Sequence, residues 1–213
     1  MSAAARSPDQ VPPHIVDAAR HVLAEDGLAA ATLERISEAA GVSRMTLHRH
    51  GVSKQRILTA LAVRLEAEYR DAFWPALVSK GNGRERLTEA LRNLCDVTEH
   101  NLGLHAALSA RTRDEIYHEQ DTGDGALTRA AFVEPLERLL LDGAGDGSLA
   151  VQSDSAETAT VLFNAVTHTY GHMRTGHGWT PKRARHALLR LVIDGLGAAP
   201  PRARAGGPAR PAA

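Results

Sequence analysis

The sequence is poor in cysteine, and this shortage excludes two kinds of architecture. Cys95 is the one cysteine among 213 residues. A single thiol cannot form an intramolecular disulfide framework, and it cannot supply a zinc site that needs several thiolates from one chain. A chain of this length can bury a substantial core without disulfides or a structural metal. We therefore expect a protein of the reducing cytoplasm.

Long apolar segments are also absent. No run of about 18 apolar residues occurs, and the first 30 residues lack a basic stretch followed by an apolar core. The sequence therefore predicts neither a membrane span nor a signal peptide. We expect a soluble protein whose partners do not include a membrane.

Motifs of the common enzyme classes are missing as well. The sequence has no glycine-rich phosphate loop, no GxSxG turn and no HExxH pair, and its acidic residues form no convergent pair. His168 and His172 stand at i and i+4, a spacing that can bind zinc or nickel, with His177 and His186 further on. No acidic or thiol ligand follows at a matching spacing. We therefore predict no enzyme, no cofactor and no metal site.

The charge is balanced overall but uneven along the chain. The sequence holds 25 Lys and Arg residues and 25 Asp and Glu residues, for a formal net charge of zero. Between residues 39 and 63, however, every charged side chain is basic: Arg44, Arg49, Lys54 and Arg56. The tail 198–213 carries three arginines and no acid, and its Pro, Gly and Ala composition predicts disorder. Residues 1–10 are small and polar, and we expect disorder there too.

Apolar residues between these ends recur at helical spacing, which predicts an all-α fold of about nine helices. Pro12 and Pro13 indicate a helix start, Gly27 indicates a helix end, and Thr32, Ser43 and Ser53 are candidate amino-terminal caps. The segment 111–124 has weak periodicity and is expected to be mixed or mobile. The expected helices span about 13–26, a short segment after Thr32, another after Ser43, a long segment from Ser53 towards Trp74 and Pro75, and then about 84–101, 103–110, 126–141, 155–175 and 181–196.

Residues 32–53 have the spacing of a helix-turn-helix. Two short helices that cross steeply need a tight turn, and Gly41 tolerates the positive φ that such a turn demands. Ile36, Ala40, Val42 and Leu47 can form the small core that the two helices share. The second helix then presents an outward face, which consists of Arg44, Met45, Thr46, His48 and Arg49.

This outward face suits the major groove of DNA. Arginine can donate two hydrogen bonds to guanine, threonine can contact a thymine methyl or a phosphate, and histidine can bond a base edge or the backbone. Ser43 and Lys54 stand at successive helix starts, where free amides favour phosphate. Taken singly, each cation could equally solvate a helix surface. Their combination with the turn, the caps and the absence of acids predicts double-stranded DNA as a partner.

The same residues carry a family resemblance. A first helix that ends in Glu-Asp-Gly, followed by TLERISEAAGVSRMTLHRHGVSKQRIL, resembles the DNA-binding domain of the tetracycline-repressor (TetR) family of transcriptional regulators. The detailed match covers about residues 13–62. By position, Thr46, His48 and Lys54 correspond to the usual phosphate contacts, and Arg44, Met45 and Arg49 correspond to the base-reading surface.

Two departures from the family pattern occur, one at His48 and one at Gly51 and Val52. Tyrosine is usual at the position of His48, and phenylalanine followed by proline is usual at Gly51 and Val52. In relatives the phenylalanine packs the second helix of the motif against the following helix, so its loss removes a core ring. Either the site is left as a gap, or Val52 or His50 turns inward to fill it.

The resemblance also implies what the second half does. Such proteins are homodimers that bind a roughly palindromic operator, usually to repress. Each subunit contributes one amino-terminal DNA-binding domain, or reading head. A small-molecule effector in the carboxy-terminal helical domain changes the spacing between the two reading heads. Apolar walls with a few hydroxyls suit an effector, and the candidates are Leu91, Cys95, Thr98, Phe132 and Tyr170. The last two helices are expected to form the dimer interface, through Leu162, Phe163, Val166, Leu188 and Leu191. Each of these residues could instead be ordinary core.

The sequence thus predicts a DNA-binding domain at 1–58, a ligand-binding and dimerisation domain at 59–197 and a disordered tail at 198–213. Its expected function is a ligand-responsive, homodimeric repressor with an unidentified effector. An enzyme is the rival class. A third class is a nucleoid-type or protein-interaction module that has lost sequence-specific binding, and Gly51 is the feature that favours it.

Overall fold

The computed structural model describes residues 11–109, 129–151 and 154–196. The segments for which the sequence predicts disorder or mobility, 1–10, 111–124 and 198–213, lie outside these ranges. Within them the secondary structure is entirely helical, as predicted. The helices are α1 Pro13–Glu25, α2 Gly27–Ala30, α3 Leu33–Ala39, α4 Arg44–Arg49, α5 Lys54–Val78, α6 Gly83–His100, α7 Leu102–Ser109, α8 Arg129–Phe132, α9 Glu134–Gly145, α10 Ser155–Thr175 and α11 Pro181–Gly195.

The positions of the longer helices confirm the sequence prediction to within a few residues. The described ranges hold eleven helices rather than about nine, because two single turns were missed. One is α2, which directly follows α1. The other is α8, which the sequence analysis merged with α9 into one helix over 126–141. Pro135 explains the break, since it lacks the amide hydrogen that a continuous helix would bond to a carbonyl of the preceding turn, and proline is tolerated in the first turn of a new helix.

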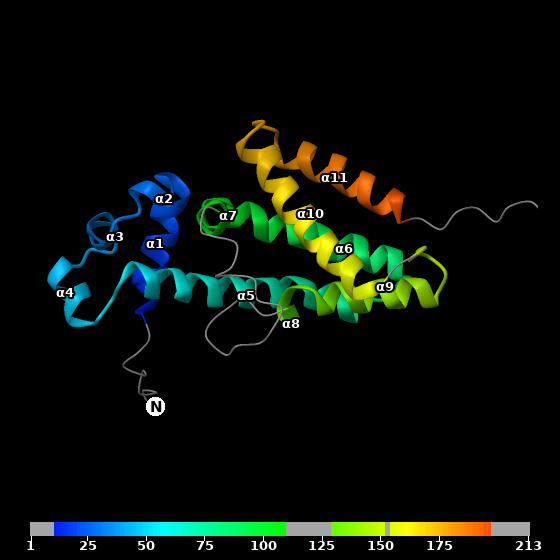
Figure 1. Cartoon of the computed structure of the whole chain (residues 1–213), viewed down its shortest axis with the longest axis horizontal. Coiled ribbons are helices and arrows are strands. Elements are labelled where there is room, and N and C mark those ends of the chain that lie inside the picture. Colours follow the sequence, from blue (N-terminus) through cyan, green and yellow to red (C-terminus); the bar gives the residue numbers. More distant parts are fainter. Residues whose placement is uncertain (1–10, 110–128, 152–153, 197–213) are drawn as a thin grey trace, which may run out of the picture.

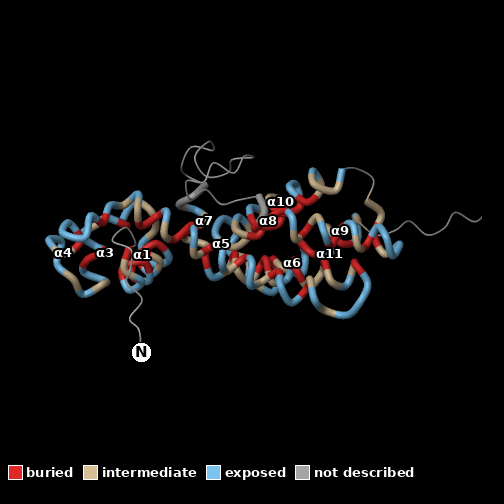
Figure 2. The backbone as a smooth tube through the Cα atoms, turned by 90° about the horizontal axis from the view of Figure 1, so that it is seen from below, coloured by how far each residue is buried: buried red, intermediate tan, exposed pale blue. Residues whose placement is uncertain are grey.

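The molecule is elongated, with α1–α4 grouped at one end (Figure 1). The long helix α5 leads away from this group and passes along the other helices, where it packs on α6 and α8. Helix α7 contacts α1 and α2, while α6, α9, α10 and α11 pack on one another. Buried positions follow the inner faces of these helices in both parts of the molecule (Figure 2). The predicted boundary between residues 58 and 59 falls inside α5, so one helix serves both parts.

The carboxyl end of α5 is held by Arg86 of α6. Proline at position 75 lies in the last turn, and the helix continues past it to Val78. Arg86 donates to the carbonyl oxygens of Ala76 at 3.0 Å and Leu77 at 2.9 Å, which have no partner within the helix. Its third contact is an ion pair with Asp142 of α9 at 2.9 Å. One largely buried guanidinium therefore joins α5, α6 and α9.

Four of the five residues predicted for a dimer interface are interior residues of the single chain. Val166 is fully buried, and Phe163 packs against Phe132 with ring centroids 5.1 Å apart. Leu162 and Leu188 are 5% and 8% exposed. The helical stripes that contain them were therefore correctly identified as apolar, but they cover their own chain. Leu191 differs, with 76% of its surface exposed.

We expect Arg86→Ala to lower the free energy of unfolding by about 2–4 kcal/mol, because it removes the donor to the Leu77 carbonyl oxygen and one of the two donors to the Ala76 carbonyl oxygen and to Asp142. Arg138→Ala is the matched control, since Arg138 also pairs with Asp142 but is 72% exposed. It should cost at most about 1 kcal/mol. Urea denaturation measures both, and equal losses would show that Arg86 acts only through Asp142.

Candidate DNA-binding site

The turn between α3 and α4 has the geometry that the sequence predicts. Gly41 adopts a φ of 65°, the left-handed conformation that favours glycine. The amide of Val42 donates to the carbonyl oxygen of Ser37 at 3.0 Å, which closes the end of α3. Ile36 and Leu47 are 2% and 1% exposed and belong to the same core. The two helices are therefore fixed relative to each other by a bonded turn and shared apolar contacts.

Side-chain caps start helices α3, α4 and α5. The hydroxyls of Thr32, Ser43 and Ser53 accept hydrogen bonds from backbone amides three residues ahead, at 3.2, 3.0 and 3.2 Å. These bonds satisfy amides that have no partner within their helices. The three caps predicted from the sequence are thus confirmed, and they fix where α3, α4 and α5 begin.

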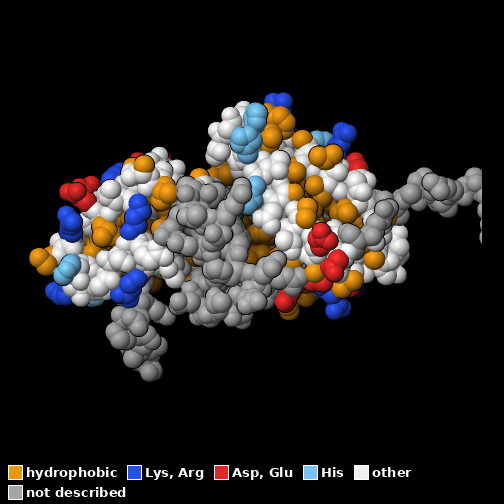
Figure 3. Space-filling model, in the orientation of Figure 1, with side chains coloured by type: hydrophobic (Ala, Val, Ile, Leu, Met, Phe, Trp, Pro, Cys, Tyr) orange, Lys and Arg blue, Asp and Glu red, His pale blue; other side chains and the backbone are white. Residues whose placement is uncertain are grey.

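Helix α4 presents the predicted outward face. Arg44, Met45, His48 and Arg49 are exposed, and Met45 reaches 73% exposure. Thr46 is half-buried, and its hydroxyl lies 2.9 Å from that of Ser43. Lys and Arg side chains with few acidic neighbours are visible on this end of the molecule (Figure 3). A short basic helix that stands out from the protein surface has the dimensions and charge for a DNA groove.

Lys54 has a structural contact that the sequence did not reveal. Its ammonium donates to the carbonyl oxygen of Leu28 in α2 at 3.3 Å, and the side chain is partly buried. An ammonium has three donors, so this bond leaves donors for a phosphate. The contact spans 26 residues of sequence, which is why local patterns gave no signal of it. Lys54 is therefore held in place at the first turn of α5.

Gly51 does not leave an unfilled gap. Val52 is 6% exposed and joins the core, and its amide donates to the carbonyl oxygen of Leu47 at 2.9 Å. His50 is exposed, so of the two inward turns considered from the sequence the structure shows that of Val52. Gly51 itself has a φ of 61°. A Cβ at this position would lie 3.0 Å from a guanidinium nitrogen of Arg56, which donates to the Gly51 carbonyl oxygen.

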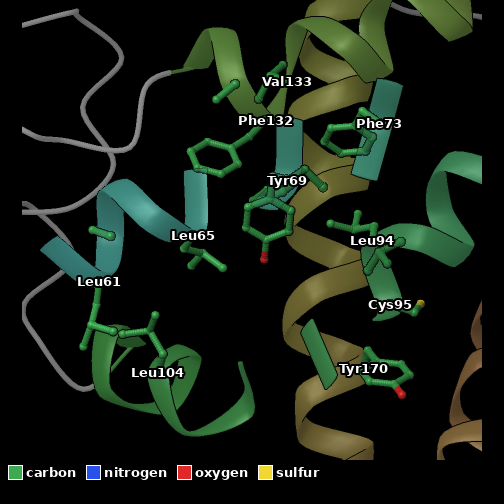
Figure 4. Close-up of a cluster of buried hydrophobic side chains, with 14 of the residues drawn as sticks. Leu61, Leu65, Tyr69, Phe73, Leu94, Cys95, Leu104, Phe132, Val133 and Tyr170 are labelled. Carbon is green, nitrogen blue, oxygen red and sulfur yellow. The ribbon is translucent and has the colours of Figure 1, made fainter. Parts of the chain in front are cut away.

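The five residues predicted to bind an effector are all buried, and Leu91, Cys95, Phe132 and Tyr170 lie at different places within one apolar core. Phe132 lies against Tyr69, with ring centroids 5.0 Å apart, whereas Cys95 and Tyr170 lie on the other side of the close-up (Figure 4). The hydroxyl of Thr98 donates to the Leu94 carbonyl oxygen within α6. Burial raises the pKa of the Cys95 thiol to about 12, so this thiol stays protonated at neutral pH.

Tyr170 belongs to an ionic network between α6 and α10. Its hydroxyl donates to Glu99 at 2.9 Å, and the same carboxylate accepts two hydrogen bonds from Arg174, both at 2.7 Å. The hydrogen bonds from Arg174 hold the pKa of Glu99 below its usual value. Because these partners are more than 70 residues apart, the sequence gave no indication that they meet.

A second network links α1 to the carboxy-terminal helices. Glu68 of α5 accepts from Arg20 of α1 at 2.6 Å and from the buried Asn101 side chain at 2.7 Å. Helix α7 lies so close to α1 that a Cβ on Gly103 would be 2.3 Å from the Leu23 carbonyl oxygen. Only glycine permits this approach. The amino-terminal helices are therefore in direct, close-packed contact with α7.

The hydroxyl of Tyr69 and the ring of His105 form a further link between α5 and α7. The oxygen and Nε2 are 2.7 Å apart. Desolvation by burial, together with the nearby His168, lowers the pKa of His105 to about 4. His105 is therefore neutral at physiological pH and can accept or donate the bond to Tyr69.

The histidines in and directly after α10 do not gather into a metal site among the described residues. The rings of His172 and His177 pack edge to face, with centroids 4.9 Å apart. Over the described residues, no group of three or more His, Cys, Asp or Glu side chains is arranged to hold a metal ion. Nor is any helix in those ranges long and apolar enough to span a membrane.

The helix-turn-helix segment is also similar in sequence to known DNA-binding regulators. Residues 15–61 match the sequence pattern of bacterial regulatory proteins of the tetR family. The chain is also 33% identical over 78 residues to the HTH-type transcriptional regulator BetI of Rhizobium meliloti, an alignment that covers 37% of this chain and 38% of that relative. The amino-terminal part of the chain is thus similar to tetR-family regulators.

Solved structures of transcriptional regulators are similar in fold over most of the chain. A TetR transcriptional regulator from Streptomyces coelicolor is 27% identical, with a TM-score of 0.56 over 87% of this chain and 97% of that one. FadR from Bacillus subtilis, solved in complex with stearoyl-CoA, is 18% identical, with a TM-score of 0.67 over 86% of this chain and 98% of that one. The tetR-family likeness in fold therefore extends well beyond the matched amino-terminal segment.

We expect Gly51→Phe to lower the free energy of unfolding by about 1–2 kcal/mol, because a side chain is strained at positive φ and the neighbouring core is already filled. Gly51→Asn should cost less, since asparagine tolerates this conformation. Gly145→Phe is the control, as Gly145 has open space around it and no positive φ. Thermal and urea denaturation measure all three, and a more stable Gly51→Phe variant would reveal a gap beside the glycine.

Proposed function

We propose that this protein is a homodimeric transcriptional repressor that binds a palindromic DNA operator and is released by a small-molecule effector. The observation that carries the proposal is helix α4, a capped helix with an exposed basic face, inside a segment that matches the tetR family. Arg44, Met45 and Arg49 read base edges, while Ser43, Thr46, His48 and Lys54 contact phosphates.

The division of roles follows from where these side chains lie. Arg44 and Arg49 are exposed on a helix that can enter the major groove, where a guanidinium can bond guanine with two donors. Lys54 is held at the first turn of the next helix by its bond to Leu28, which suits a point charge that fixes the head on the DNA backbone. Base contacts determine sequence preference, and phosphate contacts determine overall affinity.

The proposed dimer uses the exposed residues of α10 and α11. These two helices pack on each other, and each exposes a large apolar side chain: Val161 is 62% exposed and Leu191 is 76% exposed. Apolar side chains are visible among the surface atoms over both helices in Figure 3. A twofold axis through this face gives two reading heads, as a palindromic site requires.

The proposed effector acts through the contact between α7 and α1. A ligand among the helices that surround Tyr69 and Tyr170 shifts α6 or α10, and both helices contact α7. At Gly103 the backbones of α7 and α1 are in direct contact, so a shift of α7 also moves the reading head, which consists of α1–α4. FadR, a protein of similar fold, was solved in complex with stearoyl-CoA, so this fold accommodates a small-molecule ligand in another protein. In this chain the candidate effector-binding residues are Leu91, Cys95, Thr98, Phe132 and Tyr170.

Selection of bound duplexes from a random DNA pool at about 150 mM salt tests the DNA-binding role, since phosphate contacts alone bind weakly there. We expect enrichment of a twofold symmetric site. Arg44→Ala should relax base preference by about 1–3 kcal/mol at one position of each half-site, and Lys54→Ala should weaken binding to all sequences and reduce the salt slope by about one. Arg70→Ala, which removes an exposed cation from the middle of α5, should change neither.

Equal losses for Arg44→Ala and Lys54→Ala on cognate and scrambled duplexes would overturn this division of roles. Binding to every duplex, with a steep salt dependence and no enriched site, would instead favour a nucleoid-type module.

For the dimer, we expect Leu191→Glu to raise the dimer dissociation constant at least tenfold, because it buries a carboxylate in the proposed interface. Sedimentation velocity measures the change, and binding to the palindrome should fall more than binding to a half-site. Leu141→Glu, at a 52% exposed position of α9, is the control. A wild-type monomer, or equal effects of both substitutions, would place the interface elsewhere.

A further inference from the structure

A groove lies between α6 and α11, apart from the proposed DNA-binding and effector sites. Its volume is about 620 Å³, within the range of small-molecule sites. None of the five residues predicted to bind an effector lines it. Helix α11 lies in the part of the molecule remote from α4 (Figure 1), so this groove is also distinct from the reading head.

The walls of the groove are strongly basic. Arg92 of α6 and Lys182, Arg185 and Arg190 of α11 line it, together with the imidazole of His186. Asp194 is the one carboxylate among the lining residues, and it is bonded to Arg84 at 3.2 Å. Four permanent cations thus line the groove, one of them, Arg185, paired with Asp96 of α6, and the one carboxylate of the lining is already engaged. Like charges held this close favour a bound anion.

Arg185, which lines the groove, carries one guanidinium nitrogen that lacks an acceptor. One Nη of its guanidinium donates to Asp96 of α6. Its Nε is buried and has no hydrogen-bond partner among the residues that the structure describes. Buried donors are normally satisfied, so an unpaired one indicates a missing acceptor. Arginine pairs with the oxygens of phosphate through two parallel bonds, which makes a phosphoryl group a suitable acceptor.

The groove stays open in the proposed dimer. At about 100° per residue, Leu189, which lines the groove, and the exposed Leu191 point about 200° apart around α11. A partner that covers Leu191 therefore leaves the opposite face of the helix accessible.

We propose that this groove binds a small anion that carries a diphosphate group. Two linked phosphoryl groups supply enough charge and enough acceptors for four cations, whereas a single carboxylate does not. The groove runs between two helices of one chain, and its size matches a small molecule.

Isothermal titration of the full-length protein with inorganic pyrophosphate, at constant ionic strength and with chloride as the reference anion, tests the proposal. We expect one site per chain. Arg92→Gln combined with Lys182→Gln should weaken binding at least tenfold, because each substitution removes a charge-assisted contact. Both residues are exposed, so the variant should fold, which circular dichroism checks. Arg44→Gln combined with Arg49→Gln is the matched control and should bind pyrophosphate normally.

Titration with adenosine diphosphate distinguishes a nucleotide from a free diphosphate, the two kinds of molecule that carry this group. Tighter binding of the nucleotide, lost in the groove variant, identifies a nucleotide, and equal or weaker binding identifies a free diphosphate. The proposal is overturned if wild type does not bind pyrophosphate, or if the groove variant binds normally while the head variant does not. Tight groove-dependent binding of an acidic peptide without binding of pyrophosphate would also overturn it.

Discussion

The close contact between α7 and α1 is the constraint on which the rest of this structure depends. Gly103 brings the backbone of α7 against the carbonyl of Leu23, at a distance that no other residue allows. The buried Asn101, at the junction of α6 and α7, then bonds Glu68, which also holds Arg20 of α1. The head is therefore joined to the other helices by a packed contact as well as by the chain itself.

Helix α5 is the second element that joins the two parts, because its buried stripe belongs to two cores. Ile57 and Leu61 lie near its start, and Leu104 of α7 lies beside Leu61 in Figure 4. Further along, Tyr69 and Phe73 pack among the aromatic rings of the carboxy-terminal part. A rotation or tilt of α5 would disturb both cores at once. Such a shared, rigid element transmits displacement better than a flexible linker would.

Two groups of basic residues lie in remote parts of the structure. Around α4 they stand outward on a short helix, where a long anionic surface such as DNA can reach them. Between α6 and α11 they line a groove of limited volume, which favours a small anion. Both sets come from helices with ordinary amphipathic patterns. Their surroundings, rather than their residue types, decide which kind of anion each can bind.

The sequence by itself determined the local features of this protein. Caps at Thr32, Ser43 and Ser53, the turn at Gly41 and the limits of the longer helices depend on residues within a few positions of one another, so a local pattern contains them. The tertiary structure alone decided that Val52 fills the site beside Gly51, that Lys54 reaches Leu28, that Phe163 and Val166 face their own core, and that four cations meet between α6 and α11. Most of these outcomes depend on how helices far apart in the sequence pack, and helical periodicity shows which face is apolar without showing what that face will cover.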